Sequence, residues 1–182
     1  EYGGAGGDFG HEAVLILASS NPIRDADLAP IGALAVPSYS NRGLSGIDGT
    51  ISTAIGLALA SGRPGVLLCG DLAFTHDAGA LAIGPDEPRP QLRIVVADDA
   101  GGSIFATLEY GAPAFAEAFE RVFATPTGLD PAALAAGYGV AARRVTADEL
   151  DAALAAPITG LEVLVVGLDR SGRAQLSARL AA

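Results

Sequence analysis

The sequence predicts an α/β protein whose doubly wound, mainly parallel sheet carries helices on both faces. Two observations support this fold class. Short apolar runs without polar alternation recur along the chain, as expected for strands that are covered on both faces. Segments of helical composition separate these runs, and such alternation is typical of a doubly wound sheet. The chain has 182 residues, 50% of them hydrophobic, which is enough for one domain with a core of its own.

Four apolar runs are expected to form strands, at residues 13–18, 65–69, 92–97 and 161–167. Helices are expected between and after them, at residues 49–61, 74–83, 113–123, 131–139, 147–156 and 171–181. Pro113 and Pro131 lie at the expected starts of two helices, where a missing backbone N–H costs no hydrogen bond. The segment GPDEPRP, residues 84–90, is predicted to be a turn-rich surface loop.

One domain is expected. Residues 13–182 would form it, and residues 1–12 would be a loop or the remainder of a preceding segment. The sequence contains no Met, so its Gly-rich opening is interpreted as a loop inside a longer protein. The single Cys69 is interpreted as a small core residue.

Composition excludes several classes of function. A net charge of -10 argues against nucleic acids and anionic membrane surfaces, because these partners require clustered basic residues. No apolar run approaches the roughly 20 residues that cross a bilayer, and the opening lacks a secretion signal, so a cytoplasmic protein is expected. The absence of Lys excludes a Schiff-base lysine and a phosphate-binding P-loop.

Acidic residues directly follow two of the predicted strands. Asp71 comes after GVLLCG, and Asp98 and Asp99 come after LRIVVA. The carboxyl ends of parallel strands meet at one edge of a sheet, where ligands of doubly wound proteins bind. Asp71 alone could cap the next helix, and Asp98 and Asp99 before two glycines could be ordinary turn residues. Taken together, Asp71, Asp99 and the carbonyl of Gly101 offer the oxygen ligands that Mg²⁺ prefers.

Gly70-Asp71-Leu72, then 25 residues, then Asp98-Asp99 resembles the fingerprint of thiamin diphosphate enzymes. That fingerprint reads Gly-Asp-Gly, a spacer of similar length and Asn-Asn. This sequence departs from it at two places, because Leu72 replaces the third Gly and acids replace both Asn residues. The metal would therefore meet two carboxylates in place of one carboxylate and one amide.

A second stretch narrows the resemblance. Residues 38–64 are similar to the segment before the metal loop in the menaquinone-pathway 2-succinyl-5-enolpyruvyl-6-hydroxy-3-cyclohexene-1-carboxylate synthases. The motifs Ser-Asn-Arg-Gly, Gly-Ile-Asp-Gly, Gly-Asp-Leu and Gly-Gly-x-Ile-Phe occur in that family in this order, and all are present here. Residues 20–25, SNPIRD, also match a substrate-facing loop of the family. The resemblance runs from about Ala18 to the end and implies the C-terminal, diphosphate-binding domain.

The resemblance implies roles for individual residues. Magnesium would be bound by Asp71, Asp99 and the carbonyl of Gly101, and the metal would hold the diphosphate of thiamin diphosphate. The residues implied to bind the cofactor are Ile47 under the thiazolium ring, Gly70, Asp71, Leu72, Asp99 and Gly101. The residues implied to bind substrate are Ser20, Arg24, Arg42, Ile104 and Phe105.

The implied activity is the decarboxylation of 2-oxoglutarate and the addition of the remaining succinyl unit to isochorismate. Both substrates carry two carboxylates, which Arg can bind in two places at once. No catalytic residue is expected in this chain, because the resemblance implies an activating Glu on a separate pyrimidine-binding domain that nothing here resembles. The chain alone is therefore expected to be inactive, and the full-length protein is expected to be a homodimer or homotetramer.

Alternatives remain open at this stage. Arg24 follows Ser-Asn-Pro, a good helix start, and could pair only with Asp25 or Asp27. The chain could belong to another thiamin diphosphate-dependent 2-oxo acid decarboxylase or carboligase. It could also be a cofactor-free α/β binding module, an alternative that the altered Asp98-Asp99 pair keeps open.

Overall fold

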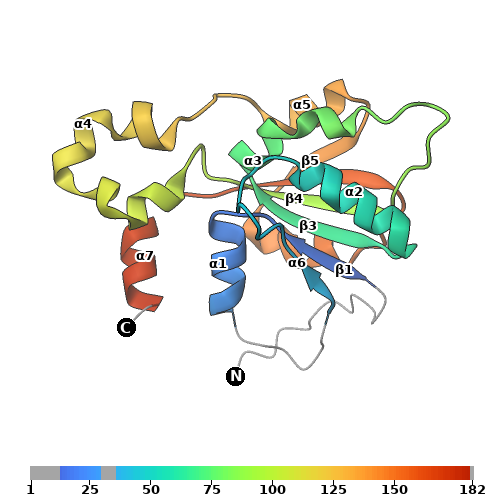
Figure 1. Ribbon diagram of the computed structural model, residues 1–182, viewed down its shortest axis with the longest axis horizontal. Coiled ribbons are helices and arrows are strands. Elements are labelled where there is room, and N and C mark those ends of the chain that lie inside the picture. The colour runs from blue at the N-terminus through green and yellow to red at the C-terminus, as the bar shows by residue number, and fades with distance from the viewer. Residues whose placement is uncertain (1–12, 30–35, 181–182) are drawn as a thin grey trace.

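The computed structural model describes residues 13–29 and 36–180, and a six-stranded sheet forms its centre (Figure 1). The strands are β1 (Val14–Leu17), β2 (Ser38–Tyr39), β3 (Gly65–Gly70), β4 (Leu92–Asp98), β5 (Ala141–Val145) and β6 (Leu161–Gly167). Their order is β2-β1-β3-β4-β6-β5, and every neighbouring pair is parallel. The predicted fold class is confirmed. The loop expected at residues 1–12 lies outside the described residues.

Helices cover the sheet on both faces. They are α1 (Asn21–Leu28), α2 (Thr50–Ser61), α3 (Asp71–His76), α4 (Ala116–Phe119), α5 (Pro131–Gly137), α6 (Ala147–Ala155) and α7 (Arg173–Leu180). Helices α2, α3 and α5 lie on one face, whereas α1 and α6 lie on the other (Figure 1). Among the described residues, no helix is long and apolar enough to cross a membrane.

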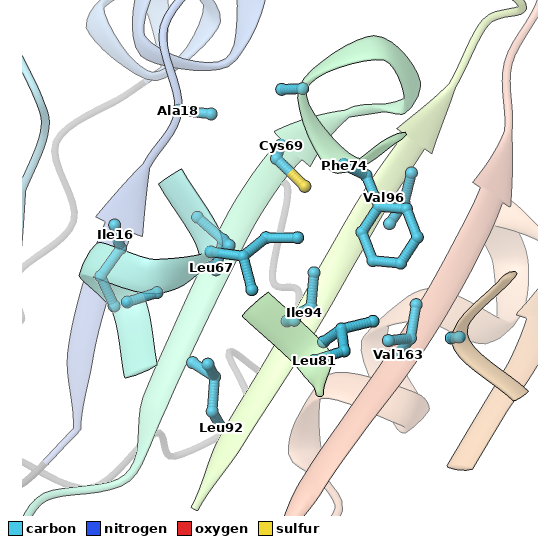
Figure 2. Close-up of a cluster of buried hydrophobic side chains, with 14 of the residues drawn as sticks. Ile16, Ala18, Leu67, Cys69, Phe74, Leu81, Leu92, Ile94, Val96 and Val163 are labelled. Carbon is cyan, nitrogen blue, oxygen red and sulfur yellow. The ribbon is translucent and has the colours of Figure 1, made fainter. Parts of the chain in front are cut away.

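Both faces of the central strands are buried, which explains why their sequences are apolar without alternation. On one face, the paired residues Leu67, Ile94 and Val163 form a row across β3, β4 and β6 (Figure 2). On the other face, a second cluster includes Val95 and Leu164 and packs against α6. Cys69 is a buried member of the first cluster, as its sequence context indicates.

The prediction of a single helix at residues 74–83 is wrong. Helix α3 begins directly after β3 and ends at His76, and a separate 3-10 helix follows at Ala78–Leu81. The chain turns at Asp77, whose carboxylate accepts hydrogen bonds from the backbone N–H and the hydroxyl of Ser52 at 2.8 and 3.2 Å. Asp77 thereby satisfies a free N–H group in the first turn of α2, and this tertiary contact was not visible in the sequence.

The prediction of a continuous helix at residues 113–123 is also wrong. Short helical pieces follow β4, namely the 3-10 helices Ser103–Thr107, Glu109–Gly111 and Pro113–Phe115, helix α4, and the π-helical turn Glu120–Ala124. Phe123 stacks on Tyr110 with ring centroids 4.5 Å apart, and the carbonyl of Ala124 accepts a hydrogen bond from the N–H of Gly102 at 2.7 Å. These contacts return the segment to the start of its own loop, which a straight helix could not do.

Among the α-helices and strands, α1, β2 and β5 were not predicted. Strand β5 lies at the edge of the sheet, and of its sequence AARRV only Val145 is buried. Strand β2 has only two residues. In α1 the only buried residue is Pro22, so an apolar helical pattern is missing although the Ser-Asn-Pro start signal is present.

Candidate functional site

A pocket of about 360 Å³ lies at the carboxyl edge of the sheet. Its lining comes mostly from the segments that follow β1, β2, β3 and β4, which are neighbours in the sheet. Strand β2 flanks β1 on one side and β3 flanks it on the other, so the direction of chain travel reverses at β1. Doubly wound proteins bind their ligands in the crevice that such a reversal opens.

Every residue to which the sequence assigned a site role lines this pocket. These residues are Ser20, Arg24, Arg42, Ile47, Gly70, Asp71, Leu72, Asp99, Gly101, Ile104 and Phe105. Strand order explains their convergence, because β1, β3 and β4 end side by side and Gly70 pairs with Ala97 in register.

The two consecutive acids at the carboxyl end of β4, Asp98 and Asp99, have different surroundings. Asp99 lines the pocket. The Asp98 carboxylate instead pairs with Arg144 on β5 at 3.3 Å, and Arg144 also contacts Asp130 at 2.8 Å. The extra charge of Asp98 is therefore balanced on the far side of the strand end, and only Asp99 shares the pocket with Asp71.

Asp71 is a buried carboxylate with 6% of its surface exposed. Its carboxyl pKa is raised to about 6 by burial and by the negative charges of Asp99 and Asp98, against hydrogen bonding from the backbone N–H of Leu72. It is the first residue of α3, and the N-cap position belongs to Gly70. Asp71 therefore carries a charge that its surroundings disfavour in the absence of a cation.

Asp99 is held by a short chain of hydrogen bonds. Burial raises the pKa of its carboxyl, while a hydrogen bond from Ser103 and the positive charges of Arg170 and Arg173 lower it. Ser103 is only 2% exposed, and its hydroxyl accepts a hydrogen bond from the side-chain amide of Asn21 at 2.7 Å. Because that hydroxyl accepts from Asn21, its own proton is available for the Asp99 carboxylate.

Two glycines fix the loop that follows Asp99. Gly101 has a φ of +138°, and a Cβ there would lie 2.5 Å from the carbonyl oxygen of Ala124. A Cβ at Gly102 would lie 2.8 Å from the carbonyl oxygen of Phe123. Only glycine allows such a close approach of two backbone segments, so this packing fixes the course of the chain at Gly101.

The donor set fits a hard divalent cation that completes its shell from other sources. Asp71, Asp99 and the carbonyl of Gly101 offer oxygen atoms, and a cation would balance the two like charges. Within the described ranges, no three His, Cys, Asp or Glu side chains form a group that could hold a metal. The oxygen atoms of Asp71, Asp99 and Gly101 suit a cation such as Mg²⁺, which keeps waters and takes phosphate oxygens as its other ligands.

Cationic side chains lie in the same pocket. The guanidinium of Arg24 donates to the carbonyl of Ser20 at 2.6 Å. Asp25, which the sequence offered as a partner for Arg24, forms its ion pair with Arg173 instead. The Arg42 side chain has no hydrogen bond or ion pair to any described residue. Arg42 is therefore free to bind an anionic ligand.

Several pocket residues were missed in the sequence. They include Ser19, Asn21, Asp25, Ser45, Ser103, Leu108, Leu168 and Arg173. Ser103 occupies the variable position of the Gly-Gly-x-Ile-Phe motif, so its place in a site segment could have identified it. Arg173 lies in a C-terminal segment without a motif, and no local signal marks it.

Comparisons with known proteins agree with this geometry. Residues 33–166 match the family described as thiamine pyrophosphate enzyme, C-terminal TPP binding domain. The 2-succinyl-5-enolpyruvyl-6-hydroxy-3-cyclohexene-1-carboxylate synthase of Rhodococcus erythropolis is 54% identical over 170 residues, covering 92% of this chain and 32% of the relative. The synthase of the same name from Paenarthrobacter aurescens is 51% identical over 177 residues, covering 91% of this chain and 30% of the relative.

A solved structure is also similar. The benzoylformate decarboxylase from Polynucleobacter necessarius superposes with a TM-score of 0.67 and 26% sequence identity, covering 88% of this chain and 30% of that one. The chain thus spans about a third of the length of these curated relatives and of that structure.

Proposed function

The chain belongs to the thiamine pyrophosphate enzymes as their C-terminal TPP-binding domain, and on this premise we propose that it serves a 2-succinyl-5-enolpyruvyl-6-hydroxy-3-cyclohexene-1-carboxylate synthase. The curated relatives of that name, which are about half identical over nearly all of the chain, support the proposal. The reaction would be decarboxylation of 2-oxoglutarate and addition of the remaining succinyl unit to isochorismate in menaquinone biosynthesis. Bound thiamin diphosphate supplies the decarboxylation and the carbon–carbon bond formation.

The proposed role of this chain is to hold the cofactor and to bind substrate carboxylates. Asp71, Asp99 and the carbonyl of Gly101 would bind Mg²⁺, and the metal would hold the diphosphate. Gly70 and Leu72 flank Asp71 in the pocket wall and would contact the cofactor together with Ile47. The metal would also balance the charge of the two carboxylates, which otherwise repel each other.

One observation carries the proposal: a single pocket contains Asp71 and Asp99 at the strand ends and, beside them, Arg24 and Arg42, whereas its third carboxylate, Asp25, is paired with Arg173. A metal diphosphate requires carboxylate ligands, whereas a dicarboxylate substrate requires cations. Arg42 has no other partner among the described residues, and its planar fork can bind a carboxylate through two hydrogen bonds. Ser20, Ile104 and Phe105 would complete the substrate wall.

The remaining parts of the proposal concern the whole protein. We propose that residues 13–182 form one domain and that the activating Glu lies on a pyrimidine-binding domain outside this chain. The full-length protein would act in the cytoplasm as a homodimer or homotetramer. Its substrates are small anions, and neither nucleic acid nor membrane insertion is part of the proposed reaction.

Titration of the full-length protein tests the cofactor proposal. Calorimetry with Mg²⁺ and thiamin diphosphate should show binding that depends on the metal. An absence of binding would favour a cofactor-free binding module. Release of carbon dioxide from 2-oxoglutarate, followed by consumption of isochorismate, tests the reaction itself.

Arg42 separates the leading proposal from a second candidate. The likeness to a benzoylformate decarboxylase favours another 2-oxo acid decarboxylase or carboligase. If Arg42 binds a substrate carboxylate, Arg42→Ala should lower kcat/KM for 2-oxoglutarate or isochorismate. The loss of transition-state stabilisation should be on the order of 2 to 4 kcal/mol, and cofactor affinity should be unchanged. Arg42→Lys should rescue only part of the loss, because a point charge cannot reproduce the fork. Turnover of benzoylformate without turnover of 2-oxoglutarate would support the second candidate.

A further inference from the structure

Helix α1 carries the proposed substrate residue Arg24 but has little apolar packing of its own. Pro22 is its only buried residue. The Arg24 guanidinium contacts the carbonyl of Ser20 at the start of the same helix, so this bond does not attach α1 to the rest of the molecule. The position of Arg24 in the pocket therefore depends on contacts that other α1 side chains make elsewhere.

Two polar contacts fix α1 from outside. At its first turn, the Asn21 amide donates to the Ser103 hydroxyl at 2.7 Å. In its second turn, the carboxylate of Asp25 accepts two hydrogen bonds from the guanidinium of Arg173. Nη1 donates to Oδ2 at 3.0 Å, and Nη2 donates to Oδ1 at 2.6 Å. A paired contact of this kind fixes orientation as well as distance. Arg24 lies in the chain between these two contacts.

Arg173 lies at the start of α7, near the end of the chain. Its side chain is 19% exposed, and its Nε is buried and has no hydrogen-bond partner among the residues that the structure describes. Helix α7 also packs against Ser103–Thr107, the segment that supplies Ile104 and Phe105 to the pocket. Helix α7 thus contacts two segments that line the same pocket, and it lies beside α1 in Figure 1.

We propose that Arg173 is a positioning residue of the substrate site, which holds Asp25 and thereby keeps Arg24 directed at the substrate. Helix α7 then belongs to the substrate site, although it lies outside residues 33–166, which match the C-terminal TPP binding domain. The inference rests on the proposed function for the role of Arg24. The metal side of the pocket is built on β3, β4 and the packing of Gly101 against Ala124, and the charge of Arg173 also acts on it through Asp99.

The test uses the full-length protein, and the ion pair between Asp25 and Arg173, called the tie below, is removed by a substitution at either residue. Arg173→Ala removes the cation, whereas Asp25→Asn keeps the cation and removes its partner, which separates the tie from the effect of Arg173 charge on Asp99. Arg24→Ala identifies the substrate whose KM depends on Arg24. The matched control is Arg170→Ala, because Arg170 forms a similar ion pair with Glu120 at 2.6 Å but does not line the pocket.

Arg173→Ala and Asp25→Asn should both raise the same KM that Arg24→Ala raises, by about tenfold. In Asp25→Asn, which keeps the charge of Arg173 near Asp99, kcat and the affinity for Mg²⁺ and thiamin diphosphate should change less than about twofold. The reversed pair, Asp25→Arg with Arg173→Asp, should recover part of the loss. An unchanged KM, or an equal loss in Arg170→Ala, would overturn the inference.

A second measurement does not depend on any substrate. Amide hydrogen exchange in α1 should accelerate at least about tenfold in Arg173→Ala and Asp25→Asn but not in Arg170→Ala, because the helix loses an anchor. Unchanged exchange would refute the positioning role whatever reaction the protein performs. Faster exchange in a protein that shows no turnover of 2-oxoglutarate would refute the proposed function and leave the tie established.

Discussion

Two clusters of buried charge lie at opposite ends of the same strand, β4, and they differ in how their charges are balanced. Arg93, near the start of β4, is 1% exposed and pairs with Glu162 on the neighbouring β6 at 2.6 Å. Its Nη1 donates to the carbonyl of Leu154 at 2.8 Å, and its Nη2, which also contacts Glu162, donates to the carbonyl of Pro157 at 3.3 Å. At the other end, Asp99 shares a pocket with Asp71, and the two charges have the same sign.

The difference separates a structural charge from a ligand-binding one. A buried ion is tolerated when an opposite charge and further hydrogen bonds surround it, as they do around Arg93. Two neighbouring carboxylates raise the pKa of one of them and oppose folding until a cation arrives. Backbone strain is more frequent at the pocket end, because Ser20, Ser45 and Ala100 have φ values of 76°, 56° and 58° and lie in the loops at the pocket edge, whereas Thr125, with a φ of 44°, does not line the pocket.

The largest expected effect on stability concerns Arg93 and Glu162, whose opposite charges balance each other at the start of β4. Arg93→Ala should lower the free energy of unfolding by about 3 to 5 kcal/mol, because Glu162 would keep a partly buried charge without its partner. Urea unfolding followed by circular dichroism measures this. Arg93→Met, which fills the space without a charge, should cost less when combined with Glu162→Gln. A loss below about 1 kcal/mol in Arg93→Ala would contradict the assignment of this pair as structural.

The next largest effect is on cofactor binding and concerns Asp71, which shares the pocket with the like charge of Asp99. Asp71→Ala should abolish metal-dependent binding of thiamin diphosphate by the full-length protein, a loss of about 3 kcal/mol or more, because a hard cation loses a charged ligand. Calorimetric titration with Mg²⁺ and the cofactor checks it. Unchanged affinity would show that Asp71 serves only the first turn of α3.

A smaller effect of opposite sign is expected for stability without metal. Asp71→Asn should raise the free energy of unfolding at pH 8 by about 2 kcal/mol, because a carboxyl pKa of about 6 in the folded state against 3.8 unfolded makes the charged form unfavourable there. Between pH 6 and 4 the folded wild type binds more protons than the unfolded chain, so its Asp71 penalty disappears as pH falls. The advantage of Asp71→Asn should shrink over the same interval in thermal melts, and an advantage that grows toward acid would contradict the assigned pKa.

The smallest effect is expected at Asp99. Asp99→Asn should weaken Mg²⁺ binding by less than about tenfold, because an amide oxygen still binds the metal and can accept the Ser103 hydrogen bond. Asp98→Asn is the matched control, since Asp98 pairs with Arg144 outside the pocket. A larger loss in Asp98→Asn than in Asp99→Asn would reverse the roles that the structure gives to the two acids.

Much of the fold and most of the pocket could be predicted because their signals are local. The apolar runs that form β1, β3, β4 and β6 identify buried parallel strands without knowledge of their neighbours. The acids that follow β3 and β4 indicated a ligand site, because parallel strands present their carboxyl ends at one edge. Edge strand β5 and weakly packed α1 were missed, because neither buries enough apolar surface to leave a periodic pattern.

The sequence by itself therefore determined the fold class, the family and the set of loops that meet at the pocket, since each depends on short segments and on the parallel direction of the strands. Tertiary structure alone decided how the charge of Asp98 is balanced, because its partner Arg144 lies on a strand two places away in the sheet. It also decided the pairing of Asp25 with Arg173, residues 148 positions apart in the chain. Such contacts are set by strand order and helix placement, and those follow from the packing of the whole core.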